Sequence, residues 1–516
     1  MREEKGRRSV VAGRLRRGGS DQVVGGMTQC EQAPHHISPL GRRYDFCIHD
    51  DVIAPGAEVV SRRGQFAEYA GPEEPGSGPD VPDDDRRPSR HRLIRSCIAS
   101  VASTSLSIYP PGGKTVYAGR VLLTLLAAVL MVPVAACGSP DHRQATAPVD
   151  RGEIVSVTPM PAMNGPETSA YLDKWKYPLP QAGGVRRYSV EYRTVAADGA
   201  PTTASGLVVV PDSENPRLRA VSYAHGTIVR RDEAPTAAGE TDRARATLFA
   251  AAGYLAVAPD YLGLGTGPGP HPYAHAPSEG TASADLLLAA RELLARQDRD
   301  LHPEVLVTGF SQGGQAALAL ARDLREGEVD GFGLRAVAAV SGPYAVQEVQ
   351  APAALDGRVD PRQAVVYLAY WITAMNRIYH LYDQSTEAFR QPYAQRVEEL
   401  FDGRHDLLRI SAGLPRTPQE LLTPEFRALA LDPTGAALRA MTDSDAVCDW
   451  RSGVPVRLYA APGDRSVPFE NSQRCMKSEL GADAELIELG DSDHGGTVRV
   501  ALPQILEWFR NTTPPA

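Results

Sequence analysis

The segment from Glu304 to Arg322 constrains the fold more than any other part of the chain. It opens with a short apolar run typical of a buried strand, passes through Gly309-Phe310-Ser311-Gln312-Gly313, and continues into an Ala- and Leu-rich stretch with good helix propensity. A strand that leads into a helix through these five residues makes a tight turn, which forces Ser311 into strained backbone angles and exposes its hydroxyl at the sheet edge. Side chains at the two glycines would collide across the turn. The pattern predicts a nucleophilic serine, and the alternative is a glycine-rich turn with an ordinary serine.

Residues 1–115 do not carry the pattern of a folded domain. They contain arginine clusters, an acidic run followed by a basic one, and scattered proline and glycine, without sustained apolar periodicity. Such a segment buries too little apolar surface to offset the entropy of ordering it. We expect a disordered leader or a stretch upstream of the true translation start.

Residues 116–136 have the features of an export signal. Arg120 precedes about a dozen apolar residues, and a small-residue exit leads into Cys137. The apolar stretch is short for a membrane span. Its ending resembles the lipobox of bacterial lipoproteins, which implies that Cys137 is lipidated and anchors the exported protein to a membrane of the cell envelope. Simple secretion after Ala136 is the alternative.

The charge of the chain argues against nucleic acid as a partner. Residues 1–137 hold 18 basic and 15 acidic side chains, too even a balance for a nucleic-acid-binding arm. The exported chain from Gly138 onward holds 36 basic and 48 acidic residues, which gives a net charge of −12. An acidic surface of that size would repel phosphates.

The cysteines predict one disulfide. Three of the six lie in residues 1–115 and a fourth is Cys137, so Cys448 and Cys475 are alone in an exported domain. In that setting a disulfide is the expected outcome. No set of residues has the spacing of a metal site, and we predict none.

Past Cys137 the sequence predicts a mostly parallel sheet interrupted by helices. Period-two patterns from Tyr188 and from Thr203 predict two antiparallel strands, and later short apolar runs predict buried ones. From Ala345 to Asp443 only helical periodicity is found, with an apolar stripe that is either the packed face of an inserted domain, the underside of a lid over an apolar pocket, or both. The expected organisation is a tether at 137–164, an α/β core at 165–344 and 448–516, and a helical insertion at 345–447.

Two further residues complete a candidate triad with Ser311. Asp464 and His494 each follow a predicted strand, so they should lie at the same sheet edge as the serine. His494 would take the serine proton, and Asp464 would orient the imidazole. Asp491 and Asp493 are rivals for the acid, but their closeness in sequence to His494 makes its far nitrogen awkward to reach.

Several motifs together resemble the secretory lipase family of α/β-hydrolases. The resemblance spans about Gly165 to Phe509 and rests on these segments and residues: His225-Gly226-Thr227, the loop Pro259–Gly265, His271-Pro272-Tyr273, Gly309–Gly314, the helical insertion, Asp464 and His494. It implies an α/β-hydrolase fold with a helical lid, carboxylic-ester hydrolysis on lipids or other acyl esters, and no cofactor. The leader and the apparent lipid anchor depart from the family pattern.

The resemblance also implies an oxyanion hole. In α/β-hydrolases a His-Gly pair after the third strand directs a backbone N–H at the substrate oxyanion. That donor would be Thr227, paired with the N–H of Gln312 directly after the nucleophile. His225 is expected to be a structural hydrogen-bonding residue, and His271 and His275 are not expected to bind a metal because Pro272 disrupts a shared helical face.

Two other functions remain open from the sequence. A serine peptidase would use the same triad but would need carboxylates near the pocket to bind a peptide amine, for which Glu279 or Asp285 could serve. A surface binding protein on an inactive hydrolase fold is a third reading, which the intact triad and oxyanion positions disfavour.

Overall fold

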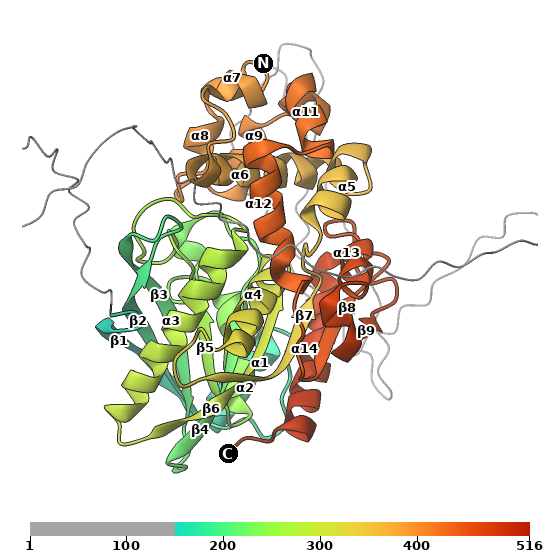
Figure 1. Cartoon of the computed structure of the whole chain (residues 1–516). Helices are drawn as coiled ribbons and strands as arrows, with labels where there is room; N and C mark the ends of the chain where they lie inside the picture. Colours follow the sequence, from blue (N-terminus) through green and yellow to red (C-terminus); the bar gives the residue numbers. More distant parts are fainter. Residues whose placement is uncertain (1–149) are drawn as a thin grey trace, which may run out of the picture. The chain divides into compact units, whose positions relative to one another are not determined.

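The computed structural model describes residues 150–516 (Figure 1). In this part of the chain one sheet of nine strands runs in the order β1-β2-β3-β5-β4-β6-β7-β8-β9. The strands are β1 (Ile154–Met163), β2 (Val185–Val195), β3 (Pro201–Pro211), β4 (Arg217–Ala224), β5 (Leu255–Pro259), β6 (Asp300–Phe310), β7 (Gly333–Val340), β8 (Val456–Ala460) and β9 (Ala484–Glu488). Pairing is antiparallel from β1 to β5 and parallel from β5 to β9.

Strand β1 corrects the expected tether. Residues 154–163 fall within the tether expected at 137–164, yet they pair antiparallel with β2, with Val157 opposite Val190. Only Ile154 of this strand is buried, and prolines stand at 159 and 161. An edge strand tolerates proline because one side of it donates no ladder hydrogen bonds, so a Pro-rich, mostly exposed segment can still be a strand.

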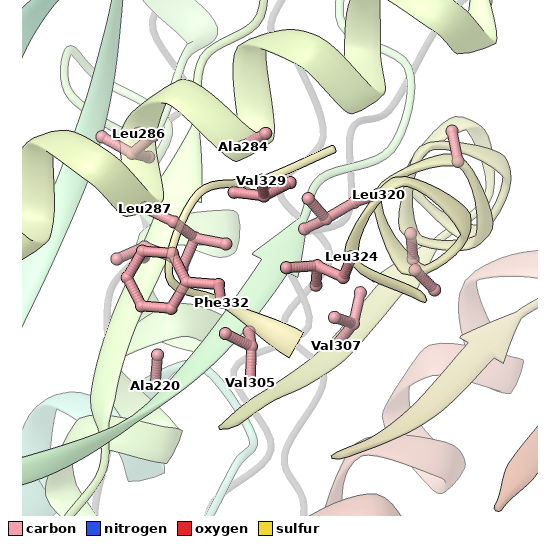
Figure 2. Packing of buried hydrophobic residues seen from close by; sticks show 14 of the residues in the cluster. Ala220, Ala284, Leu286, Leu287, Val305, Val307, Leu320, Leu324, Val329 and Phe332 are labelled. Atoms are coloured by element: carbon pink, nitrogen blue, oxygen red, sulfur yellow. The ribbon is translucent and has the colours of Figure 1, made fainter. Parts of the chain in front are cut away.

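Helices cover both faces of the sheet. They are α1 (Gly165–Lys174), α2 (Glu240–Ala251), α3 (Ala276–Ala295), α4 (Gln312–Glu326), α13 (Glu470–Cys475) and α14 (His494–Thr512). On one face α3 and α4 pack over Val305 and Val307 of β6, as Figure 2 shows with Leu287 and Leu324. Leu306 points to the other face and joins the cluster formed with α1, α2 and α14. Because successive strand residues alternate, one apolar run supplies both cores.

A helical insertion separates β7 from β8, as expected, and lies at one end of the sheet (Figure 1). It comprises a π-helical turn (Val346–Gln350), α5 (Ala351–Asp356), α6 (Pro361–Tyr379), α7 (Ser385–Ala388), α8 (Val397–Leu400), α9 (Leu407–Gly413), α10 (Pro418–Leu421), α11 (Pro424–Leu431) and α12 (Gly435–Asp445). The helical insertion has a hydrophobic core of its own, centred on α6. Asp360 caps α6 by accepting from the backbone N–H groups of Arg362 and Gln363.

Cys448 and Cys475 form the predicted disulfide, with an S–S distance of 1.95 Å. Cys448 ends the short 3-10 turn (Ala446–Cys448) that follows α12, and Cys475 ends α13, which follows β8. The bond therefore fastens the exit of the helical insertion to the second half of the core.

Removing this disulfide should lower the free energy of unfolding by about 3 kcal/mol. The bond closes a loop across a sequence separation of 27, and a loop of that size restricts the unfolded chain by roughly this amount. Denaturant titration of Cys448→Ala/Cys475→Ala measures the change. The reduced wild-type protein is the control and should match the double variant, whereas equal midpoints for oxidised wild type and double variant would contradict the prediction.

The expected leader at 1–115, the signal at 116–136 and the anchor Cys137 lie outside the described residues. Within residues 150–516, no helix combines the length and the apolar character needed to cross a bilayer.

Candidate active site

Ser311 occupies a sharp turn between β6 and α4. Its backbone angles are φ 58° and ψ −123°, a region that costs a non-glycine residue conformational energy. A Cβ at Gly309 would stand 2.0 Å from the carbonyl oxygen of Gly313, and one at Gly313 would stand 2.1 Å from that of Ala224. Both glycines are therefore a steric condition, Gly309 for the turn itself, as the sequence indicated, and Gly313 for the close approach of β4.

The three residues of the candidate triad lie in a line. The Ser311 Oγ is 2.9 Å from His494 Nε2, and His494 Nδ1 is 2.7 Å from Asp464 Oδ2. His494 begins α14 and Asp464 follows β8, so neighbouring parallel strands deliver both to the edge where β6 ends. The Asp464 side chain is 1% exposed, and its Oδ1 accepts from the backbone N–H groups of Ser466 and Val467 at 2.8 and 3.0 Å.

The rival carboxylates have other surroundings. Asp493 caps α14 by accepting from the backbone N–H of Gly496 at 2.6 Å, and its side chain is 79% exposed. Asp491 is also exposed. The carboxylate that reaches the His494 ring is that of Asp464.

An apolar cavity lies beside Ser311, between the sheet edge and the helical insertion. Thr227 and Gln312, the expected oxyanion donors, line it together with Ser311 and Tyr273. The rest of the lining comes mostly from the helical insertion and is apolar: Ala354 of α5, Leu368, Trp371 and Ile372 of α6, Phe426, Leu429 and Ala430 of α11, and Ala437 and Met441 of α12. The insertion thus supplies both a packed domain and one wall of the cavity at Ser311.

His225 and His275 bond to other groups of the protein interior and do not contact the triad. Both ring nitrogens of the buried His225 face backbone carbonyls, those of Gly226 and Asp260. His275 contacts the Ser278 hydroxyl and the Tyr379 phenol, and burial lowers its pKa to about 4. Across residues 150–516, no group of three or more potential ligands is placed to hold a metal ion.

A buried polar cluster next to the nucleophile was not foreseen. The side-chain amide of Gln312 lies 2.6 Å from Glu279 Oε1 and 2.8 Å from His271 Nε2. From the sequence, Glu279 and Asp285 were expected to matter only as anchors for a peptide amine. Glu279 is 1% exposed and outside the cavity lining, and Asp285 bonds to Arg151 at 2.9 Å. The contact between Glu279 and Gln312 could not be predicted from the sequence, because the two residues are 33 positions apart and lie on different helices.

The sheet order, the strand-turn-helix at Ser311 and the flanking helices define an α/β-hydrolase fold with a helical insertion, as the sequence predicted. Neither a family model nor a curated protein matches the chain. Solved structures do match it, and they share this fold.

Two of these structures are about one quarter identical to the chain. A Legionella pneumophila protein assigned to the hydrolases is 26% identical, with a TM-score of 0.64, and the match covers 70% of this chain and 98% of that one. The rice cell wall degrading esterase LipA from Xanthomonas oryzae is 25% identical over the same shares, with a TM-score of 0.60. Candida antarctica lipase A in its closed state is 15% identical, covering 71% and 84%, with a TM-score of 0.53, and bears on the fold alone. The chain is a hydrolase, and these neighbours support hydrolysis of esters.

Proposed function

We propose that the protein is a serine hydrolase that cleaves carboxylic esters through an acyl-enzyme on Ser311. The observation that carries the proposal is the line from Ser311 Oγ through His494 to Asp464 at the wall of an apolar cavity. Nucleophile, base and orienting carboxylate are within hydrogen-bonding distance of one another, which is the geometry that activates a serine.

The proposed reaction has two halves. Ser311 Oγ attacks the ester carbonyl while His494 Nε2 takes the hydroxyl proton, and Asp464 stabilises the imidazolium through Nδ1. The backbone N–H groups of Thr227 and Gln312 would bind the oxyanion of the tetrahedral intermediate. His494 then gives its proton to the alcohol as the ester bond breaks. In the second half, water attacks the acyl-serine by the same route, and the carboxylic acid leaves.

The cavity supports an apolar acyl group on the substrate. Its lining from α6, α11 and α12 is almost entirely aliphatic or aromatic, so a hydrocarbon chain placed there would leave water. We infer that acylglycerols or other acyl esters are the substrates. In the described part of the chain no carboxylate lines this cavity, so nothing there favours binding of a peptide amine.

Hydrolysis of p-nitrophenyl esters of increasing acyl length tests this proposal. We expect turnover of the esters and not of aminoacyl anilides. Ala430→Phe should leave acetate esters within a few-fold of wild type and lower kcat/KM for dodecanoate at least about tenfold, because the phenyl ring fills cavity space that a long chain would occupy.

The matched control is Ala428→Phe, the same change on the exposed side of α11. It should leave the whole series unchanged. Preferential cleavage of anilides would instead support the peptidase, and equal losses at every acyl length in Ala430→Phe would place the acyl chain elsewhere.

We further propose that this enzyme acts outside the cytoplasm, attached to a membrane through lipidated Cys137. The signal-like residues 116–136 motivate this placement, and the disulfide between Cys448 and Cys475 fits an oxidising compartment. The proposed steps use only protein groups and water, and nucleic acid has no part in them.

A further inference from the structure

The side chain of Gln312 is held from two sides inside the protein. Its Nε2 donates to Glu279 Oε1 at 2.6 Å and to His271 Nε2 at 2.8 Å. The orientation of the amide follows from the histidine. His271 Nδ1 lies 2.8 Å from the carbonyl oxygen of Leu262, which can only accept, so Nδ1 carries the ring proton and Nε2 must accept. The nitrogen of the Gln312 amide therefore faces both partners.

All three members of this Glu279–Gln312–His271 cluster are buried. Their exposed fractions are 1% for Glu279, 2% for Gln312 and 4% for His271. They come from three separate places in the fold, namely the first turn of α3, the first residue of α4 and the loop after β5. Burying polar groups of this kind costs free energy unless they are paired, and Glu279 Oε2 and Gln312 Oε1 have no hydrogen-bond partner among the described residues. Buried titratable groups with strongly shifted pKa values are concentrated at functional sites.

The cluster is uncharged at neutral pH. Burial raises the pKa of Glu279 to about 8, opposed by hydrogen bonds from the Gln312 amide and the Ala274 backbone. Burial lowers the pKa of His271 to about 3. The titratable groups that Glu279 in turn influences are the phenols of Tyr261, Tyr273 and Tyr370, whose pKa values burial raises far above neutrality. His225 and Arg231 influence His271, and Arg231 also influences Tyr370, but among the described residues no cation pairs with Glu279.

The position of Gln312 links the cluster to the reaction. Its backbone N–H follows the nucleophile directly, at the start of α4, and is the expected donor to the oxyanion. A donor contributes most when it is already oriented, and a rotation of the first turn of α4 would misdirect it. Clamping the Gln312 side chain to α3 and to the 261–273 loop restricts that rotation.

We propose that Glu279 and His271 are positioning residues, which clamp the Gln312 side chain so that its backbone N–H faces the oxyanion, and that Glu279 must remain an uncharged acid to do so. This inference rests on the proposed ester hydrolysis. An ionised Glu279 would place a negative charge one side chain away from the negative oxyanion and would disfavour it in a low-dielectric interior.

The pH dependence has a definite sign. Below pH 8 Glu279 is protonated and the site is competent, and above pH 8 the ionised fraction grows and kcat falls. If the ionised form is inactive, kcat at pH 9 should be about tenfold below its value at pH 7. Glutamine has the shape of a protonated glutamic acid and cannot ionise, so Glu279→Gln should keep the neutral-pH rate within a few-fold and remain flat to pH 10.

The experiment measures kcat and KM for a p-nitrophenyl ester between pH 6 and pH 10, corrected for spontaneous hydrolysis. Glu279→Leu removes the acceptor and should lower kcat roughly tenfold or more at every pH with little change in KM, because donor orientation acts on the transition state. Glu279→Gln should restore the rate. Asp285→Asn is the matched control, since it replaces another buried acid of α3 that pairs with Arg151, and it should keep the wild-type profile.

The outcomes separate this inference from the proposed function. In one outcome the wild-type protein hydrolyses esters and reacts with a fluorophosphonate while its kcat stays flat from pH 7 to pH 10. That result overturns the role of Glu279 and leaves the proposed ester hydrolysis intact. An alkaline fall in Glu279→Gln equal to that of wild type does the same. Wild type that neither hydrolyses esters nor reacts with the fluorophosphonate overturns both.

Discussion

Ser311→Ala is expected to lower kcat/KM for ester hydrolysis by about 10⁴- to 10⁶-fold, with little change in stability. In the proposed mechanism Ser311 Oγ is the only protein atom that bonds covalently to the substrate. The groups of a triad act as a unit, so removal of the serine hydroxyl abolishes most of the rate enhancement of all three. Alanine lacks only the hydroxyl, and the helix cap does not depend on it, because Ser311 makes no side-chain cap hydrogen bond. Fluorophosphonate labelling followed by mass spectrometry should place the adduct on Ser311 in wild type and show none in the variant.

Ser341→Ala is the matched control for this result. Ser341 is also buried, also has a positive φ, of 46°, and also follows a parallel strand, β7. Its hydroxyl donates to Thr497 Oγ1 at 3.0 Å and not to the His494 ring. Its replacement should leave both rate and labelling within a few-fold of wild type. A Ser311→Ala protein that keeps the wild-type rate would refute the proposed nucleophile.

Asp464→Asn is expected to lower kcat by about 10⁴-fold near neutral pH through the tautomer of His494. The Asp464 Oδ1 accepts from two backbone N–H groups, at Ser466 and Val467, so an asparagine must keep its carbonyl oxygen there and turn its NH₂ toward His494. The ring nitrogen Nδ1 would then accept, and Nε2 would carry the proton. A protonated Nε2 cannot take the proton of Ser311.

Asp493→Asn distinguishes this prediction from a general effect of charge near the histidine. Asparagine at 493 can still cap α14, because Asn and Asp are equally good at that position. We expect steady-state kinetics to show kcat within a few-fold of wild type. A large loss in Asp493→Asn together with a small one in Asp464→Asn would assign the acid role to Asp493.

The helical insertion is joined to the loop that holds Asp464. The backbone N–H of Asp360 donates to the carbonyl oxygen of Arg465 at 2.9 Å, and Gln350 Nε2 donates to that of Ser466 at 3.0 Å. The insertion therefore contributes to the seating of the proposed acid as well as to the wall of the cavity. The apolar stripe of the insertion predicted a packed domain or a lid. The connection to the Asp464 loop could not be predicted, because it depends on contacts between segments about one hundred residues apart.

Much of the fold could be predicted because the parallel strands carry a strong local signal. The apolar runs that form β4, β5, β6, β7 and β8 are buried on both faces, and no other environment suits them. Strand β1 could not be predicted. Its pairing is made through backbone hydrogen bonds to β2, and its own side chains are mostly exposed. The sequence of β1 therefore has no apolar alternation from which a strand could be predicted.

By itself the sequence determined the turn at Ser311, because a Cβ at Gly309 would collide with the carbonyl oxygen of Gly313 within the same five residues, whereas the clash at Gly313 is with Ala224 of β4 and depends on the packing of the strands. The sequence also limited the candidates for the catalytic base and the orienting carboxylate to a few residues that follow predicted strands. Only the tertiary structure decided that the Ser311 hydroxyl meets His494 across 183 positions, that Asp464 rather than Asp493 reaches the ring, and that Glu279 holds Gln312 instead of facing the cavity. These are distances between side chains on different elements, which are set by how strands and helices pack and which no local pattern encodes.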